Sequence, residues 1–249
     1  MTIVQRLTDR PHATMRLFCF PYAGGAASAF RPWRALPEEI EVYAIQLSGR
    51  EDRFAEEPVT ELAPILDELE RAFTRYTGKP FAFFGHSLGA LVGWEFARRL
   101  RRLEMALPAH TFVSGARAPQ CPRDADFSGL SDAELVEHVR DSSAAPARVL
   151  ENTELMLIFA RQLRADFRLA AGYKYRPDAP LDCEFSVFGG VDDGSVGPEH
   201  LEAWAELTTA PIRRCMFPGE HFFLHSAREE VLREVSSTLD DVLRRQATQ

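Results

Sequence analysis

The chain has 249 residues, of which 45% are hydrophobic, and it carries a formal net charge of −8. This length and composition suit one large domain with a full core, and the acidic balance argues against general nucleic-acid binding. No linker rich in glycine, serine or proline divides the sequence, so we expect a single domain over residues 1–249.

The N-terminal segment and the cysteines bear on the compartment and on metal binding. Residues 1–14 are charged at Arg6, Asp9 and Arg10 and lack the apolar core of a secretory signal, and no later run is long enough to span a membrane. The four cysteines are widely spaced with no C-x-x-C pair, which indicates neither a zinc site nor a disulfide framework. We therefore expect a cytoplasmic protein that binds no metal and no membrane.

Six apolar, β-prone segments alternate with helical patterns along the chain. This alternation predicts an α/β fold, with a mostly parallel sheet flanked by helices on both faces. The expected strands are residues 15–21, 41–47, 80–84, 109–114, 183–188 and 212–217.

Apolar spacing and end signals predict the flanking helices. Thr60 opens one with an apolar stripe from Leu62 to Phe73, and Gly197-Pro198 opens another. The last helix is expected to begin at the capping-box pattern Ser226-x-x-Glu229 and to bury one stripe of residues, namely Val231, Leu232, Val235, Leu239 and Val242.

Residues 117–175 separate two expected strands by more than an ordinary crossover needs. Ser131-x-x-Glu134 predicts the start of a short helix there, and an apolar stripe predicts a longer one that begins near Thr153. Helices inserted above the carboxyl ends of parallel strands lie where ligands bind. We expect a helical lid, and a decorative insertion is the alternative.

A candidate nucleophile stands between the third expected strand and the helix that follows. Residues 85–89 read Gly-His-Ser-Leu-Gly, a G-x-S-x-G pattern, and apolar residues recur at helical spacing from Leu88 to Leu103. A serine at such a sharp turn is held in strained geometry with its hydroxyl exposed at the sheet edge. Ser87 is therefore the candidate nucleophile, and a coincidental turn is the alternative.

Serine needs a base, and the base needs an orienting acid. After the fifth expected strand come Asp192 and Asp193, and after the sixth comes His221. We assign His221 as base and Asp193 as acid, with Asp192 left open. His86 is expected to support the turn, and a metal role for His225 lacks the H-E-x-x-H pattern and a third ligand.

Acyl transfer also requires hydrogen-bond donors for the oxyanion. One is expected to be the backbone amide of Leu88, directly after the nucleophile, and the other the amide of Ala23 in the glycine-bearing turn after the first expected strand. A phosphate-binding loop is the rival interpretation of that turn. The sequence contains neither G-K-[ST] nor G-x-G-x-x-G to favour it.

Arginine supplies nearly all of the positive charge, and two clusters stand out. Solvated surface is one interpretation, and a docking patch for an acidic partner is the other. The clusters are Arg50 with Arg53, and Arg98 with Arg99, Arg101 and Arg102.

Taken together, these segments resemble the type II thioesterases that accompany polyketide and nonribosomal peptide synthetases, members of the α/β-hydrolase superfamily. The resemblance implies a triad of Ser87, Asp193 and His221, and hydrolysis of acyl groups from the phosphopantetheine arm of acyl or peptidyl carrier protein domains, with no further cofactor. It rests on residues 20–25 (FPYAGG), 46–51 (QLSGRE), 85–90 (GHSLGA), 114–119 (SGARAP), 164–167 (RADF) and 219–223 (GEHFF).

Two other functions remain open at this point. A general carboxylesterase or lipase of the same fold would prefer free oxygen esters and gain nothing from a carrier protein. A hydrolase-like binding protein would use the pocket without turnover, and it would not need the serine, the acid and the histidine together.

Overall fold

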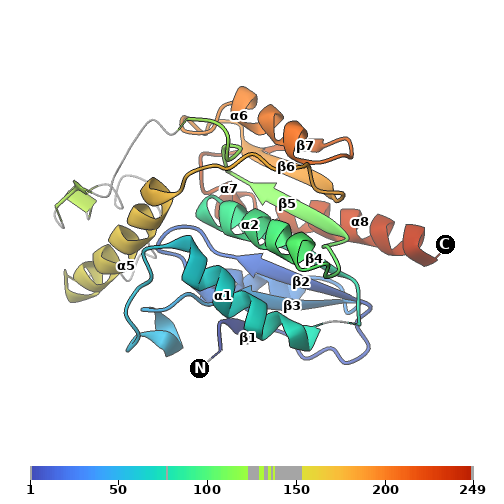
Figure 1. The fold of residues 1–249 in the computed structure, drawn as a ribbon, viewed down its shortest axis with the longest axis horizontal. Helices are drawn as coiled ribbons and strands as arrows, with labels where there is room; N and C mark the ends of the chain where they lie inside the picture. The colour runs from blue at the N-terminus through green and yellow to red at the C-terminus, as the bar shows by residue number, and fades with distance from the viewer. Residues whose placement is uncertain are drawn as a thin grey trace.

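The computed structural model describes residues 2–76, 78–122, 129–131, 134–135, 137 and 153–247 (Figure 1). Within them lies a seven-stranded sheet in the order β1-β3-β2-β4-β5-β6-β7, in which every neighbouring pair is parallel except β1 with β3. The strands are β1 Val4–Arg6, β2 Met15–Phe20, β3 Ile40–Ile45, β4 Phe81–His86, β5 His110–Ser114, β6 Glu184–Gly190 and β7 Arg213–Phe217.

The six expected strands are confirmed to within a few residues, and β1 is an addition. β1 has only three residues, and it pairs antiparallel with β3 at the edge of the sheet. Ile3 and Val4 are buried there. A run this short carries too little alternation to be recognised in the sequence.

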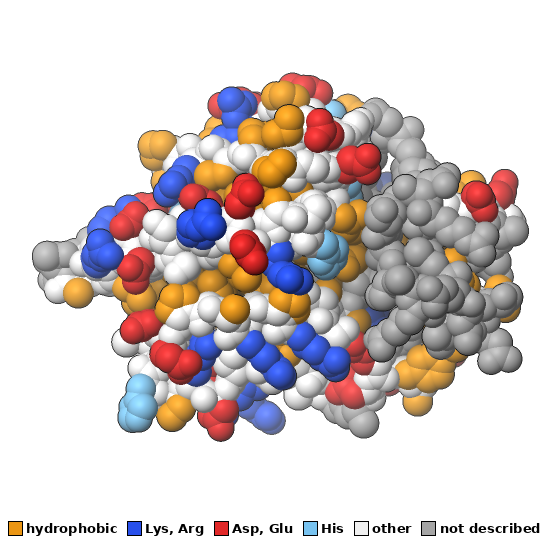
Figure 2. All heavy atoms as spheres, turned by 180° about the vertical axis from the view of Figure 1, so that it is seen from behind, with side chains coloured by type: hydrophobic (Ala, Val, Ile, Leu, Met, Phe, Trp, Pro, Cys, Tyr) orange, Lys and Arg blue, Asp and Glu red, His pale blue; other side chains and the backbone are white. Residues whose placement is uncertain are grey.

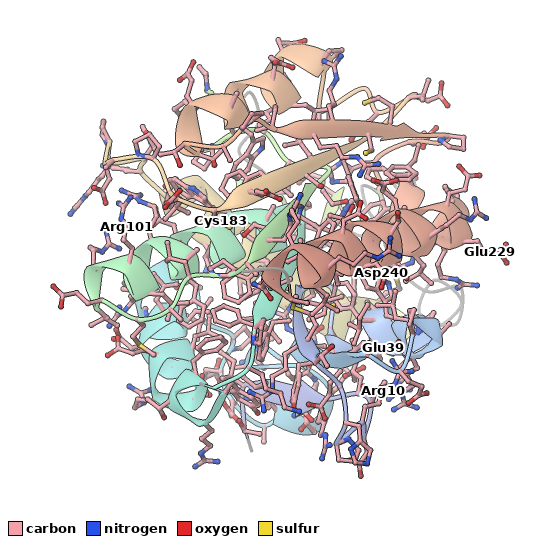
Figure 3. All side chains as sticks on the ribbon, turned by 90° about the vertical axis from the view of Figure 1, so that its right-hand side faces the viewer. Arg10, Glu39, Arg101, Cys183, Glu229 and Asp240 are labelled. Carbon is pink, nitrogen blue, oxygen red and sulfur yellow. The ribbon has the colours of Figure 1, made fainter. Side chains whose placement is uncertain are left out.

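Helices cover both faces of the sheet (Figures 1 and 3). Aromatic and aliphatic side chains of α1, α2, α6 and η5 pack on one face, and those of η1, α7 and α8 pack on the other. The helices are η1 Ala27–Ala35, η2 Glu51–Arg53, α1 Leu62–Phe73, η3 Thr74–Tyr76, α2 Leu88–Arg102, α5 Thr153–Gly172, α6 Pro198–Glu202, η5 Ala203–Leu207, α7 Phe223–Ser226 and α8 Arg228–Ala247.

The start of the last helix was predicted wrongly. Ser226 does not cap it, because Ser226 ends α7 and α8 begins at Arg228. The amide of Ala227 donates to the carbonyl of Phe223, so backbone bonds of α7 continue up to the start of α8. The predicted stripe is otherwise buried as expected, with Leu232 only partly so.

Part of the expected 117–175 insertion lies outside the described residues, namely 123–128, 132–133, 136 and 138–152. The predicted long helix is confirmed as α5, and Ser131 and Glu134 exchange the reciprocal hydrogen bonds of a capping box. Side chains from α5 form a third apolar cluster with Leu135. None of the helices described has the length and apolar character needed to cross a bilayer.

Candidate active site

Ser87 stands in the strained turn that the G-x-S-x-G pattern predicts. It lies between the last residue of β4 and the first residue of α2, with φ 52° and ψ −116°. Its amide donates to the carbonyl of Ser114 at 2.8 Å, which ties the turn to the end of β5. Residues other than glycine rarely adopt a positive φ, and such strain is found where surrounding structure enforces it.

The two glycines of the pattern allow backbones to pass closely. A Cβ on Gly89 would lie 2.0 Å from the carbonyl oxygen of Phe20, and a Cβ on Gly85 would lie 2.4 Å from that of Gly89. Both distances are shorter than the distance to which a carbon and an oxygen atom that are not bonded to each other can approach. The pattern therefore has a steric cause here, because strand β2, strand β4 and helix α2 meet at the turn.

His86 lies beneath the turn as a buried, neutral support, in agreement with the expectation from sequence. Its Nδ1 hydrogen-bonds to the Ser114 hydroxyl at 2.9 Å, and its side chain has no exposed surface. Burial, and next the nearby His221 and His225, lower its pKa well below the ordinary value. Its ring centre is 5.2 Å from that of His221.

Asp193 and His221 meet directly, although 28 residues separate them in the chain. Asp193 Oδ2 is 2.8 Å from His221 Nδ1, on loops that follow β6 and β7. Burial disfavours the charged carboxylate, but hydrogen bonds from His221 and Ser195 outweigh it and lower the pKa of Asp193 to about 2. A charged acid at Nδ1 leaves Nε2 of the imidazole free to accept a proton.

The structure distinguishes between the two neighbouring acids. Asp193 is buried, whereas Asp192 is exposed and its amide donates to the Gly219 carbonyl. A further residue, Ser195, was not anticipated: its hydroxyl donates to Asp193 Oδ1 at 2.6 Å, and its amide donates to the same oxygen. A serine two residues after a loop aspartate is the sequence signal for such a turn.

Ser87 lies beside the Asp193–His221 pair through its neighbour His86. Among the described residues, no hydrogen bond joins the Ser87 hydroxyl to His221. Serine–histidine contacts of this kind are often long in unliganded proteins and tighten when substrate binds. The structure therefore brings Asp193 and His221 together. Ser87 directly follows His86, whose ring packs against that of His221, at the same edge of the sheet.

The two expected oxyanion donors follow paired positions on adjacent strands, because Phe20 of β2 pairs with Gly85 of β4. Among the described residues, neither the Ala23 amide nor the Leu88 amide donates a hydrogen bond to a protein acceptor. The next two amides of the turn are occupied, with Gly24 donating to Asp166 and Gly25 to the Tyr22 carbonyl. Leu88 is also the first residue of α2, where the helix dipole favours negative charge.

Tyr22 connects this turn to the histidine loop. Its hydroxyl and His225 Nε2 share a hydrogen bond of 2.8 Å, and its ring packs edge-on against those of His86 and Phe222. Burial raises the pKa of Tyr22 to about 12. The described residues contain no group of three or more histidine, cysteine, aspartate or glutamate side chains that could hold a metal ion.

The buried arginines of the two clusters cannot form the docking patch that was one interpretation of the sequence. Arg99, Arg101 and Arg102 are at least partly exposed and ion-paired, and for them the docking interpretation stays a prediction. Arg50 and Arg53 are buried and paired with carboxylates, and so is Arg98, which contacts Glu95. On the opposite side of the sheet from α2, the face in Figure 2 shows basic and acidic side chains intermingled over its described part. Arg50 pairs with Asp166, which is distant in the chain, and Arg98 pairs with Glu95 of the same helix. The spacing of the arginines in the sequence does not show that either one is paired.

The comparisons with known proteins agree with this geometry. A family model described as a thioesterase domain matches residues 15–239. The chain is 43% identical over 233 residues to the gramicidin S biosynthesis protein GrsT of Aneurinibacillus migulanus, covering 93% of this chain and 91% of that protein.

Solved structures show the same likeness. RedJ, a thioesterase of the prodiginine pathway in Streptomyces coelicolor, superimposes with a TM-score of 0.87 at 38% identity, covering 92% of each chain. BorB, a type II thioesterase from the borrelidin biosynthetic cluster, gives 0.86 at 32% identity, covering 94% of this chain and 96% of its own. The sheet order and flanking helices of the chain are those of the α/β-hydrolase fold.

Proposed function

The chain belongs to the thioesterase domain family, and from that premise we propose that it is a type II thioesterase that hydrolyses acyl groups from the phosphopantetheine arm of carrier protein domains. Its similarity to proteins of the gramicidin S, prodiginine and borrelidin pathways supports a role in polyketide or nonribosomal peptide biosynthesis, where stalled or aberrant chains must be removed. The proposal places the enzyme in the cytoplasm with its carrier-bound substrates.

The first step acylates Ser87. His221 Nε2 takes the hydroxyl proton while Ser87 Oγ attacks the thioester carbonyl, and Asp193 holds the resulting imidazolium. The carbonyl π electrons move to oxygen, which the amides of Ala23 and Leu88 stabilise. Collapse of this intermediate breaks the carbon–sulfur bond, and the proton passes from His221 to the departing thiolate.

The second step returns the enzyme to its starting state. Water gives a proton to His221 and attacks the acyl-enzyme carbonyl, the oxyanion forms again at the same two amides, and Ser87 leaves with the proton as the free acid departs. The reaction needs only these side chains, two amides and water. We therefore propose that the enzyme uses no metal or other cofactor.

One observation carries this proposal: the hydrogen bond of 2.8 Å between His221 and the buried Asp193 lies at the same sheet edge as the strained Ser87 turn. Many proteins share one part of this arrangement by chance, but an ionised acid bound to the histidine beside such a serine is the requirement for serine acyl transfer.

We also propose that residues 117–175 act as a lid over the acyl chain within a single domain. The described part of this segment supports the proposal, because an apolar cluster from α5 packs next to Ala23 in the oxyanion turn. An acyl chain attached to Ser87 would therefore meet apolar surface on leaving the turn. The cluster includes Met156, Phe159, Ala160 and Leu163, with Leu135 against them.

The test compares one short acyl group in three forms: on a carrier protein, on a small soluble thiol, and as an oxygen ester. Wild-type enzyme should hydrolyse the carrier-bound form with the highest kcat/KM, and Ser87→Ala should lower turnover by at least about 10⁴-fold. Preference for the oxygen ester would favour a general esterase. Activity that survives Ser87→Ala would exclude the proposed nucleophile.

A further inference from the structure

A buried ion pair joins two sequence motifs that the catalytic steps leave unused. Arg50, from the loop after β3, contacts Asp166 of α5 through two parallel hydrogen bonds of 2.9 Å, although 116 residues separate them. The exposed fractions of the two side chains are 2% and 1%. This is the bidentate geometry that fixes a guanidinium and a carboxylate in one mutual orientation.

The same pair forms hydrogen bonds with the backbone of the 22–25 turn, which carries the proposed oxyanion donor Ala23. Asp166 Oδ2 accepts the Gly24 amide at 2.7 Å, and Arg50 Nη1 donates to the Gly25 carbonyl at 2.8 Å. These contacts orient the peptide planes immediately after Ala23. They do so without using the Ala23 amide itself, which donates no hydrogen bond to a protein acceptor among the described residues.

Helix α5 also packs directly against this turn. Gly24 has φ +74°, and a Cβ placed there would lie 2.6 Å from the ring of Phe159. One turn along α5, the side-chain amide of Gln162 donates to the Gly49 carbonyl at 2.7 Å, beside Arg50 in the β3 loop. The turn, the β3 loop and α5 are thus joined by polar contacts that are all buried.

Stability alone gives a poor reason for this pair. Removing two charges from water costs about as much as their attraction returns, and apolar residues of similar volume often serve equally well in a core. The pair instead fixes geometry, because the planar guanidinium and the carboxylate that it orients determine where the Gly24 amide and the Gly25 carbonyl lie. A displacement of about 1 Å at a reacting group can lower a rate by about 10²-fold.

We propose that Arg50 and Asp166 are positioning residues that hold the 22–25 turn so that the Ala23 amide faces the oxyanion, and that they link this amide to the placement of α5. The inference rests on the proposed function, since it assigns a task to residues around the same site. Neither side chain is assigned contact with the substrate.

The experiment measures two properties of Asp166→Asn, Arg50→Lys and the double variant. The first is hydrolysis of a small soluble thioester, for which kcat should fall by about 10²-fold while KM changes by less than about 3-fold. The second is inhibition by a trifluoromethyl ketone of the same acyl chain, which forms a hemiketal with Ser87 whose oxyanion occupies the hole. Its affinity should fall by a similar factor, whereas affinity for the free acid product should not.

The matched control is Arg53→Lys. Arg53 is also a buried arginine of the β3 loop, paired with Glu56 and Glu68, but among the described residues no hydrogen bond or ion pair joins it to the 22–25 turn. This variant should lose thermal stability to a similar extent and keep the wild-type affinity for the ketone. Because the pair acts as one unit, the double variant should be little worse than either single variant.

Two results would overturn the inference. One is that the positioning variants melt earlier yet keep wild-type kcat and ketone affinity; the other is that Arg53→Lys loses ketone affinity equally. If a single variant fails to fold, the remaining one still gives the kcat and ketone readings. Failure of the proposed function is read separately, in wild-type enzyme, as thioester hydrolysis that survives Ser87→Ala.

Discussion

The Ser87 turn and the 22–25 turn lie at the ends of paired strands, but they are positioned in different ways. Ser87 is held mainly by its own strand, its own helix and two glycines that lie within two residues of it, with one further backbone bond to Ser114 of β5. The 22–25 turn is held by partners 142 and 203 residues away, Asp166 and His225. A turn whose geometry is set mainly by neighbouring residues can be predicted from a short sequence motif. A turn held by residues distant in the chain can be understood only once the whole fold is known.

The largest expected effect comes from replacing Asp193, the proposed acid that orients His221 for Ser87. Asp193→Asn should lower kcat by about 10⁴-fold, because the amide no longer holds His221 in the tautomer that accepts the serine proton. Steady-state hydrolysis of a soluble thioester measures this. Asp192→Asn is the matched control, since Asp192 is exposed and should keep near wild-type activity. Equal losses in both variants would contradict the assignment of Asp193.

A pair of glycine substitutions tests the comparison itself. Gly89→Ala should cost at least about 3 kcal/mol of stability and lower the melting temperature by about 6–12 °C, because its Cβ would meet the Phe20 carbonyl at 2.0 Å. Gly24→Ala should cost only about 1–2 kcal/mol, since the Phe159 ring it meets is able to move.

The ratio of lost activity to lost stability should be larger for Gly24→Ala than for Gly89→Ala. Gly24→Ala should lower kcat well beyond its small loss of stability, because it moves the oxyanion turn. Thermal melts and kinetics on the same samples give both quantities. If Gly24→Ala has near wild-type kcat, the turn does not need its contacts with α5.

His86 makes the Ser87 turn sensitive to acid. Its imidazole stays neutral in the folded protein, with a pKa well below that of the unfolded chain near 6.5. The unfolded chain therefore binds more protons than the folded protein as the pH falls below about 6.5, and stability declines progressively in that window. Above about pH 6.5 this loss is absent.

His86→Asn should flatten that decline, because asparagine does not titrate and its amide is able to replace the hydrogen bond to Ser114. Melting temperatures at pH 7 and pH 5 measure it. Some acid sensitivity should remain, since burial also lowers the pKa of His110 to about 3. A variant that declines as steeply as wild type would show that His86 is not the source.

The smallest expected effect belongs to the second contact of the 22–25 turn. Tyr22→Phe removes the hydrogen bond to His225 but keeps the ring packing, so kcat should fall by about 3–10-fold, equivalent to about 1 kcal/mol. Kinetics on the soluble thioester measure the change. A loss as large as that of Asp166→Asn would mean that the histidine loop holds the turn as firmly as α5 does.

The sequence predicted the parts of the molecule whose causes are local. Strand and helix periodicity and the glycines around Ser87 act within a few residues. The serine, the acid and the histidine lie far apart in the chain, but each follows a predicted strand, so their order was still readable. Strand β1 was missed because three residues show no period, and the start of α8 was misplaced because α7 reaches Ser226. The Arg50 cluster was misjudged because Asp166 lies 116 residues away.

The hydrogen bond between Tyr22 and His225 also has a consequence for how the protein is made. The site draws on residues from near the start of the chain to the loop after β7, so a nascent chain that has not yet emerged beyond β7 lacks the base. Long-range pairing of this kind is also slow to form. Under the proposed mechanism, a product of translation that stops before His221 therefore cannot hydrolyse a thioester.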